Sequence, residues 1–413
     1  MTNLIEVRRD FTPPSTRNRT FRSREKFPDN LPTGKDALAL SNAETRKLGL
    51  SITPSNLRLK CAPLYPLYQD YIKQMQDLRK QYPSLVKIVE YGKGANGTPL
   101  YAMRITSHSS QNSSSQNSSS QNSSSQNSSS QNSSPQSSSP KPAVLFTGLI
   151  HAREWATGKV TMQTALNLLQ GRKADPEAAK FLREAELWFI PVVNPEGYDY
   201  SRTMNSFWRK NRAVIYQNSS SLDSSSTKQK VGIGVDLNRN FWDPKHQAIY
   251  RISGFHNSNK TTLGASNNPK DEDYRGPYRA SEPEIKALQN FMAQHKNLIG
   301  IIDHHSYGNE ILYPWGYTKE KVKNVQEYLA AGKAMKKAGG ENFKLHQSVG
   351  LYPTTGSSED YEQANGIFNF TLEIGSCFHS SEKELNKLLT QVPKMNFAFI
   401  GWVLQHKKNR GEE

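Results

Sequence analysis

Residues 142–155 read PAVLFTGLIHAREW, an apolar run that ends in a polar cluster. A short continuous apolar run such as AVLFTGLI predicts a buried β-strand. His151 and Glu154 stand directly at its end, three residues apart, so both side chains could face one metal ion. Trp155 occupies the place of the second histidine in an H-x-x-E-H metalloprotease motif. The stretch therefore predicts a strand followed by part of a metal site.

The segments around this strand alternate between strand and helix patterns. Further strands are predicted at LYAMRI, LWFIPVV, NLIGIID and GIFNFTLEIG, which cover residues 100–105, 187–193, 297–303 and 366–375. Helices are predicted at 157–170 and 281–295, and a long helix closes the chain through residue 406. Buried strands that alternate with helices are typical of α/β folds. We therefore expect a single globular α/β domain with a central mixed twisted β-sheet flanked by helices.

Segments of biased composition interrupt or flank this pattern. Residues 108–140 contain uncharged QNSSS repeats that cannot build a core, which predicts a flexible loop insertion. Residues 217–230 predict a second, Ser-rich loop. Residues 1–60 carry 12 Lys and Arg against 6 Asp and Glu and lack periodicity, so we expect them to be largely disordered. The folded domain is thus expected at 61–407, followed by a charged tail at 408–413.

The net charge of +16 raises the question of nucleic-acid binding. Beyond residue 60 the positive charge is spread thinly, without a basic helix or a nucleic-acid module, so no specific nucleic-acid partner is expected. Two cysteines exclude a disulfide framework and a multi-cysteine zinc site. No apolar run approaches the roughly 18 residues of a membrane span, and no signal peptide is visible. These features leave the localisation open.

The rest of a metal site has to come from another part of the chain. Among the ten histidines, the pair His304-His305 stands at the end of the strand LIGIID, as His151 stands at the end of LFTGLI. Two histidines at two strand ends, together with Glu154, would make a His₂Glu zinc site. Three protein ligands leave one position open, which is typical of catalytic zinc sites. On this pattern alone, two unrelated histidines remain the alternative.

Six motifs together resemble the zinc carboxypeptidase family. They are, in chain order, HAREW at 151–155, NPEGY at 194–198, FWRKNR at 207–212, GVDLNRN at 234–240, HSYGNEILYPWGY at 305–317 and FTLE at 370–373. The resemblance extends over residues 62–407 and omits the N-terminal segment and the Ser-rich insertions. It implies a zinc carboxypeptidase-like catalytic domain with one Zn²⁺ per chain. It also implies hydrolysis of the C-terminal peptide bond of peptides or proteins.

The resemblance assigns the metal ligands. It implies that His305 is the third ligand beside His151 and Glu154. His304 then faces elsewhere, because adjacent side chains of a strand point to opposite faces. Asp236, in GVDLNRN, matches the family's carboxylate that orients the first zinc-binding histidine.

The resemblance also implies which residues carry out the reaction. Glu373, at the end of FTLE, matches the general base that takes a proton from water and passes it to the leaving amine. Arg209 matches the arginine that stabilises the negative oxygen of the transition state. Taken without the resemblance, a glutamate at the end of a buried strand is usually paired or solvated.

Further residues match positions that bind the substrate. Asn238 and Arg239 match the pair that holds the terminal carboxylate, and such a clamp makes an exopeptidase. Arg153 and Tyr307 match residues that line the site further along the peptide. Tyr352, in GLYPTTG, matches the mobile tyrosine that covers the bound end residue.

Glu359 bears on the preference for the C-terminal residue. It stands seven residues after Tyr352, where basic-specific members of the family carry an acid, so a preference for Lys or Arg is expected. Against this, Asp360 follows at once, and the segment could be an acidic, solvated loop. The alternatives are apolar C-terminal residues, cell-wall or glutamyl peptides on the same fold, and a binding protein without catalysis. The complete ligand set argues against the last alternative, and we expect a monomer.

Overall fold

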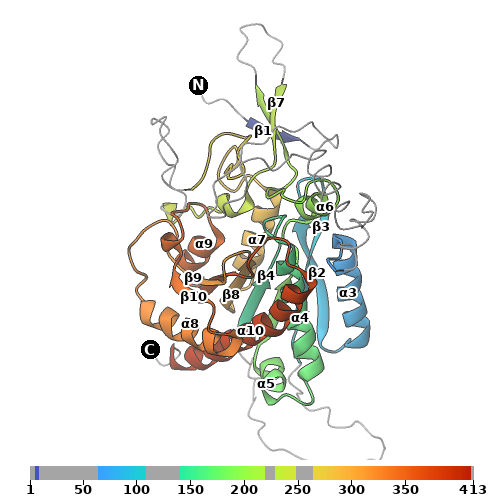
Figure 1. The fold of residues 1–413 in the computed structure, drawn as a ribbon, viewed down its shortest axis with the longest axis vertical. Coiled ribbons are helices and arrows are strands. Elements are labelled where there is room, and N and C mark those ends of the chain that lie inside the picture. The colour runs from blue at the N-terminus through green and yellow to red at the C-terminus, as the bar shows by residue number, and fades with distance from the viewer. Residues whose placement is uncertain (1–4, 9–63, 108–139, 219–227, 248–263, 411–413) are drawn as a thin grey trace, which may run out of the picture.

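The computed structural model describes residues 5–8, 64–107, 140–218, 228–247 and 264–410. Its centre is an eight-stranded sheet in the order β10-β9-β11-β8-β4-β5-β3-β2 (Figure 1). The strands are β2 (Val86–Lys93), β3 (Pro99–Ile105), β4 (Ala143–Thr147), β5 (Glu186–Ile190), β8 (Leu298–His305), β9 (Glu310–Tyr313), β10 (Lys344–Gln347) and β11 (Phe368–Glu373). The central pairs β5–β4, β4–β8 and β8–β11 are parallel. The pairs β2–β3, β3–β5 and β9–β11 are antiparallel. The α/β fold with a mixed sheet is therefore confirmed.

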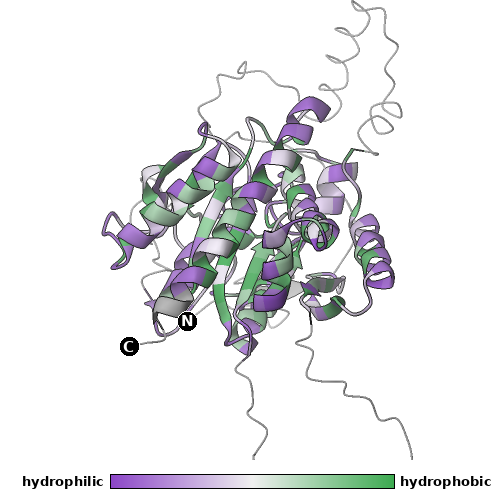
Figure 2. Cartoon of the chain, turned by 90° about the horizontal axis from the view of Figure 1, so that it is seen from below, coloured by the Kyte–Doolittle hydropathy of each residue, from purple (hydrophilic) through white to green (hydrophobic). Residues whose placement is uncertain are grey.

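Helices cover both faces of this sheet. They are α3 (Tyr68–Gln81), α4 (Trp155–Gly171), α5 (Pro176–Glu184), α6 (Pro195–Thr203), α7 (Pro283–Gln294), α8 (Val325–Gly339), α9 (Ser358–Ala364) and α10 (Glu382–Arg410). Figure 2 shows the strands largely hydrophobic, with hydrophilic residues on the helices and loops around them. None of the helices in the described ranges is both long and apolar enough to span a membrane.

The alternation of side chains along β4 separates two cores. Val144 and Phe146 belong to a large cluster that includes side chains of α4 and α10. Ala143 and Leu145 point the other way, into a cluster with α7. Burial of a Phe or Leu side chain contributes about 1.5–3 kcal/mol, so β4 is held firmly from both faces. A strand held in this way provides a rigid base for the residues that follow it.

Some boundaries differ from the sequence expectation. The strand predicted at 187–193 ends at Ile190, because Pro191 has no N–H to donate to a neighbouring strand. The loop predicted at 217–230 is shorter, since residues 217–218 lie in β6 (Val214–Asn218) and 228–230 in β7 (Lys228–Ile233). Main-chain pairing between these strands does not require apolar side chains, so composition alone missed them.

A small second sheet has the order β1-β6-β7, in which β1 (Ile5–Arg8) pairs with β6 antiparallel. The segment predicted to be disordered therefore contains a strand. The other residues of 1–60, the repeat at 108–139 and residues 219–227 lie outside the described residues, as do 411–413.

Candidate metal centre and substrate site

The candidate metal ligands lie at the ends of two neighbouring parallel strands. β4 and β8 are paired up to Thr147 and Asp303, so both chains leave the sheet at the same edge. His151 follows β4 after a short turn, Glu154 directly precedes α4, and His305 is the last residue of β8. All three side chains are buried, and their ligand atoms lie within 4.8 Å of one another.

The donor atoms fit a divalent metal. His151 Nδ1 lies 2.8 Å from Glu154 Oε1 and 3.1 Å from His305 Nδ1, which lies 3.2 Å from Glu154 Oε2. In a tetrahedral zinc site with bonds of about 2.0–2.1 Å, neighbouring ligand atoms are roughly 3.3 Å apart. Two imidazoles and a carboxylate are also a donor set that zinc prefers. These three residues could therefore hold a zinc ion.

The charges of this cluster are strongly coupled. Burial alone would favour neutral groups, but His151 and His305 together lower the pKa of Glu154. Burial likewise opposes protonation of His305, yet the attraction of Glu154, Glu373 and Asp303 raises its pKa to about 9. A carboxylate that attracts a proton onto a neighbouring imidazole has the same attraction for a metal cation.

His304 faces away from this cluster. Its ring stacks on Phe146 and its nitrogens contact Thr147 O, Thr161 and Asn396 in the interior. Burial lowers its pKa to about 4, so the ring is neutral at physiological pH. The expected alternation of the two adjacent histidines is confirmed, and His304 is a packing residue.

Asp236 connects the metal ligands to the predicted substrate residues. It is fully buried and accepts hydrogen bonds from Arg209 Nε at 2.9 Å and from the main-chain N–H of Asn238 at 3.0 Å. Its Oδ1 also lies 3.2 Å from His151 Nε2. A His151 tautomer that donates from Nε2 keeps the Nδ1 lone pair free for a metal.

Arg209 lies between Asp236 and the metal cluster. Its Nη1 is 3.3 Å from His151 Nδ1 and 3.9 Å from Glu154 Oε1. Although burial opposes the charge, Asp236 raises the pKa of Arg209, so the guanidinium stays charged. A positive group thus stands at the edge of the candidate metal centre.

Glu373 ends β11, directly beside His305 in the parallel register of β8 and β11. Burial raises the pKa of Glu373 to about 8. On the other side of β11, Glu310 of β9 stands opposite Glu373. Glu310 was not singled out from the sequence, because only the pairing of β9 with β11 brings it there.

The predicted carboxylate clamp is formed by a short helical turn, Leu237–Arg239. The Asn238 side-chain oxygen accepts the N–H of Ser358 at 2.8 Å, which joins this turn to the start of α9. Arg239 donates to Gly264 O and Asn238 O, so its guanidinium is held by main-chain carbonyls. The Tyr352 ring lies 5.8 Å from the Arg239 guanidinium and is 44% exposed. Asn238, Arg239 and Tyr352 therefore lie together.

Arg153 and Tyr307 both contact Phe378, and Arg153 also contacts Glu272; the sequence indicated neither partner. Arg153 forms an ion pair with Glu272 at 2.8 Å and lies over the Phe378 ring at 4.4 Å. The Phe378 ring in turn meets the Tyr307 ring edge-on at 4.8 Å. Glu272 and Phe378 are both more than 100 residues from Arg153 along the chain, so no sequence pattern predicts these contacts.

Glu359 is buried and not part of a solvated loop. It lies in α9, only 6% exposed, and its Oε2 accepts hydrogen bonds from Ser348 Oγ at 2.5 Å and Thr371 Oγ1 at 3.0 Å. Asp360 is fully buried as well. Burial raises the pKa of both carboxyl groups. The alternative of an acidic, solvated segment is therefore wrong.

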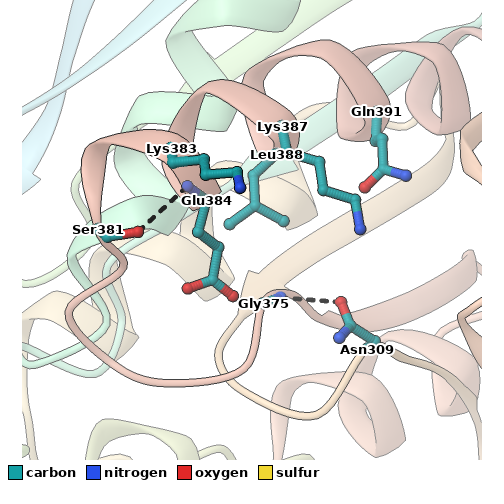
Figure 3. A pocket seen from close by; sticks show the side chains of 8 residues that line it. All are labelled: Asn309, Gly375, Ser381, Lys383, Glu384, Lys387, Leu388 and Gln391. Carbon is teal, nitrogen blue, oxygen red and sulfur yellow. Dashed lines mark hydrogen bonds between the residues drawn. The ribbon is translucent and has the colours of Figure 1, made fainter.

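A separate surface pocket of about 280 Å³ lies beside the start of α10. Figure 3 shows Lys383, Lys387 and Glu384 of this helix along it, with Asn309 and Gly375 on the opposite side. None of the predicted site residues lines it. Its lining residues Asn309 and Gly375 follow the predicted site residues Tyr307 and Glu373 by two positions each.

Comparison with known proteins agrees with this geometry. A family model described as zinc carboxypeptidase matches residues 71–392. The chain is similar to carboxypeptidase A4 of Mus musculus, with 27% identity over 318 residues, 76% of this chain and 62% of that protein. It is also similar to carboxypeptidase O of Homo sapiens, with 33% identity over 232 residues, 54% of this chain and 55% of that protein. The chain thus spans less than two thirds of the length of these curated relatives.

Among solved structures, the fold matches that of bovine thrombin-activatable fibrinolysis inhibitor in complex with tick carboxypeptidase inhibitor. The TM-score is 0.63 at 23% identity, and the match covers 83% of this chain and 98% of that chain. At this identity the likeness concerns the fold.

Proposed function

The chain belongs to the zinc carboxypeptidase family, and from this premise we propose that it removes the C-terminal residue of peptides or proteins by zinc-assisted hydrolysis. The observation that carries the proposal is the convergence of His151, Glu154 and His305 within 4.8 Å, beside a buried Asp236–Arg209 pair. A chain that only bound peptides would not need three buried metal-type donors facing one another.

His151, Glu154 and His305 would hold one zinc ion per chain, and Asp236 would orient His151. The ion, when bound, supplies a nucleophile at neutral pH and polarises a carbonyl group. Arg209 then offers a fixed positive charge where negative charge develops on the substrate oxygen. Because Asp236 and the protein interior already hold this guanidinium, little reorganisation is needed during the reaction.

Glu373 is proposed as the group that moves protons. Its place at the end of β11, next to His305 in register, puts a carboxylate at the edge of the metal cluster. From there it can take a proton from water and deliver it to the departing amine. No other carboxylate among the described residues combines this position with freedom from a role as metal ligand.

Asn238 and Arg239 are proposed to bind the substrate's terminal carboxylate. A guanidinium donates two parallel hydrogen bonds to a carboxylate, and its planar shape sets the orientation. Tyr352, whose ring lies near the Arg239 guanidinium and is partly exposed, would cover the end residue. Arg153 and Tyr307 would contact the preceding part of the peptide. A clamp for a free carboxylate limits cleavage to the last bond.

The preference for C-terminal Lys or Arg rests on Glu359. Its burial supports this proposal, because a buried carboxylate without a basic partner favours a cationic ligand. No ion pair to Glu359 is formed within the described ranges. The monomeric state stays a prediction.

The test is hydrolysis of matched peptides that end in Lys, Arg, Phe or Leu, with and without a zinc chelator. We expect chelator-sensitive release of the last residue, fastest for Lys and Arg. Release that survives the chelator would contradict the zinc mechanism. Faster release of Phe and Leu would contradict the role of Glu359 and leave the mechanism standing.

A further inference from the structure

A buried network of side chains joins the two segments that carry Arg209 and Arg239. Asn211 lies two residues after Arg209, Asn240 directly follows Arg239, and both asparagine side chains are fully buried. Glu282, directly before α7, contacts both asparagines. Its Oε2 accepts Asn211 Nδ2 at 2.6 Å, and its main-chain N–H donates to Asn240 Oδ1 at 3.0 Å. One glutamate therefore connects the segments of the two arginines.

Asn211 also binds the segment of the proposed clamp directly. Its Oδ1 accepts the N–H of Val235 at 2.8 Å, and its own N–H donates to Val235 O at 3.1 Å. Val235 precedes Asp236, the carboxylate that accepts a hydrogen bond from Arg209 Nε. Because buried groups cannot exchange these bonds for water, a shift of Asn211 would move both arginine segments.

The other oxygen of Glu282 is held as well. Ser281 Oγ donates to Glu282 Oε1 at 2.6 Å and accepts Asn240 Nδ2 at 3.0 Å. Gly276 leaves room for this contact, because a Cβ there would lie 2.5 Å from Ser281 Oγ and 2.6 Å from Asn240 Nδ2. Both oxygens of Glu282 thus have a donor, and the direction of the side chain is fixed.

A second buried carboxyl group contacts the same amide. Glu284 is fully buried, and its Oε2 lies 3.3 Å from Asn211 Nδ2, the atom that donates to Glu282 Oε2. Its Oε1 accepts the N–H of Ala95 at 3.0 Å. In the described part of the chain, no Lys or Arg forms an ion pair with either glutamate. Two ionised carboxylates beside one donor repel each other in the interior, so the pair is stable when it holds one proton.

The charged groups around the pair favour that proton. Burial and the charges of Glu282 and Glu196 raise the pKa of Glu284 to about 8, and burial raises the pKa of Glu282. Lys286 of α7 favours an ionised Glu282 but does not outweigh burial. The groups of neighbouring elements that act on the pair or on Glu196 are Glu196 of α6, Tyr91 of β2 and Arg212. At neutral pH the pair therefore carries one proton and one negative charge.

We propose that Glu282 and Glu284, sharing one proton, are positioning residues that hold Arg209 and Arg239 at the spacing that peptide hydrolysis requires. The inference rests on the proposed function, because it assigns the two arginines to one substrate. Neither glutamate touches that substrate. With the proton in place, Glu282 holds the amide of Asn211 and the network stays intact. When the proton leaves, the two carboxylates repel each other, Asn211 shifts, and the arginines no longer fit one peptide end.

The first experiment compares the pH dependence of KM in the wild-type chain and in Glu284→Gln. The variant keeps an oxygen for Ala95 and places an NH₂ group, which does not titrate, toward Glu282. At pH 6.5 the two chains should have KM values within about twofold. At pH 9 only about a tenth of the wild-type chains keep the proton, so KM should rise roughly tenfold in the wild type and clearly less in the variant. Since burial also lowers the pKa of Lys210 to about 8, the difference between the two chains is the readout. Glu341→Gln, exposed between α8 and β10, is the control and should follow the wild type.

The second experiment does not depend on turnover. Calorimetry on the zinc-loaded chain measures binding of N-acetyl-L-lysine, which has a free carboxylate, and of its methylamide, which has none. Glu282→Leu removes both acceptor oxygens and should weaken binding of the acid about tenfold. Glu282→Gln keeps an oxygen for Asn211 and should restore most of it. Zinc affinity, measured by chelator competition, should stay within about threefold in all variants, because the metal ligands lie outside this network.

The outcomes separate the proposal from the proposed function. Weaker binding of the acid in Glu282→Leu, recovered in Glu282→Gln, supports the proposal even if no peptide is cleaved. Wild-type binding in a folded Glu282→Leu chain overturns it. If Glu282→Leu does not fold, binding of the acid to Glu284→Gln at pH 6.5 and 9 decides, and a loss as large as in the wild type overturns the proposal. Absence of peptide cleavage alone contradicts only the proposed function.

Discussion

Replacement of Asp236 by Asn tests whether this residue organises the candidate metal centre. The carboxylate accepts from Arg209 Nε on one oxygen, and its other oxygen meets the Asn238 N–H and His151 Nε2. An Asn side chain has one oxygen and one NH₂ group. Whichever way the amide is turned, its NH₂ group faces at least one donor. Asp236→Asn therefore removes the negative charge and at least one of these hydrogen bonds.

The expected loss follows from these contacts. Loss of one partner of a buried ion pair costs about 3–5 kcal/mol of the free energy of unfolding. Since the Arg209 side chain keeps 11% exposure, we expect about 3 kcal/mol. A misoriented ligand histidine usually weakens metal binding about 10–100-fold. The same change at Asp243, another buried aspartate that contacts His246 and Asn365 away from the metal ligands, is the control and should keep zinc affinity.

Zinc affinity is measured by competition with a chelator of known affinity, and stability by urea unfolding. Circular dichroism at low temperature verifies that Asp236→Asn is folded before zinc is added. A folded Asp236→Asn chain whose zinc affinity lies within about threefold of the wild type would refute the idea that Asp236 orients His151.

Three further changes probe the proposed carboxylate clamp, the proposed role of Glu359 and the buried carboxyl group of Glu284. Arg239→Lys removes the planar guanidinium that could donate two hydrogen bonds to a carboxylate. In steady-state kinetics, KM for any peptide should rise roughly tenfold or more while kcat changes less. An unchanged KM would exclude the clamp. Glu359→Gln keeps an oxygen for Ser348 and Thr371 but places an NH₂ group beside Gly316 and removes the negative charge. The Lys-to-Leu ratio of kcat/KM should therefore fall roughly tenfold. An unchanged ratio would contradict the proposed role of Glu359. Burial raises the pKa of Glu284 from an ordinary value of 4.5 to about 8. Between these two values the folded chain keeps a proton that the unfolded chain releases. The free energy of unfolding therefore falls as the pH rises from about 5 to 8. Glu284→Gln should reduce that fall in urea unfolding at pH 5.5, 7 and 8.5, and an equally steep fall would show that other groups cause it.

The strands and most helices were predictable because each depends on local pattern. Apolar runs in α/β proteins become buried strands almost wherever they occur, so β3, β8 and β11 were found near their true positions. β6 and β7 were not predicted, and residues 217–218 and 228–230 were assigned to a loop, because main-chain pairing holds strands that no side-chain pattern marks. The end of β5 was misplaced because the apolar run continues past Pro191. Main-chain hydrogen bonding to the neighbouring strand cannot continue there, since proline has no N–H.

The sequence by itself determined that His151, Glu154 and His305 stand where buried strands end, and the family motifs indicated their roles. Only the tertiary structure decided that the three donor sets meet within 4.8 Å, since this depends on the parallel register of β4 and β8. The same holds for Glu359, which the sequence left open between a solvated acid and a buried one. Ser348 and Thr371, which donate hydrogen bonds to Glu359, come from separate segments of the chain. Gly316, beside the oxygens of Glu359, Thr354 and Asp360, comes from another. Contacts between segments far apart along the chain are set by packing across the whole fold, and no local spacing encodes them.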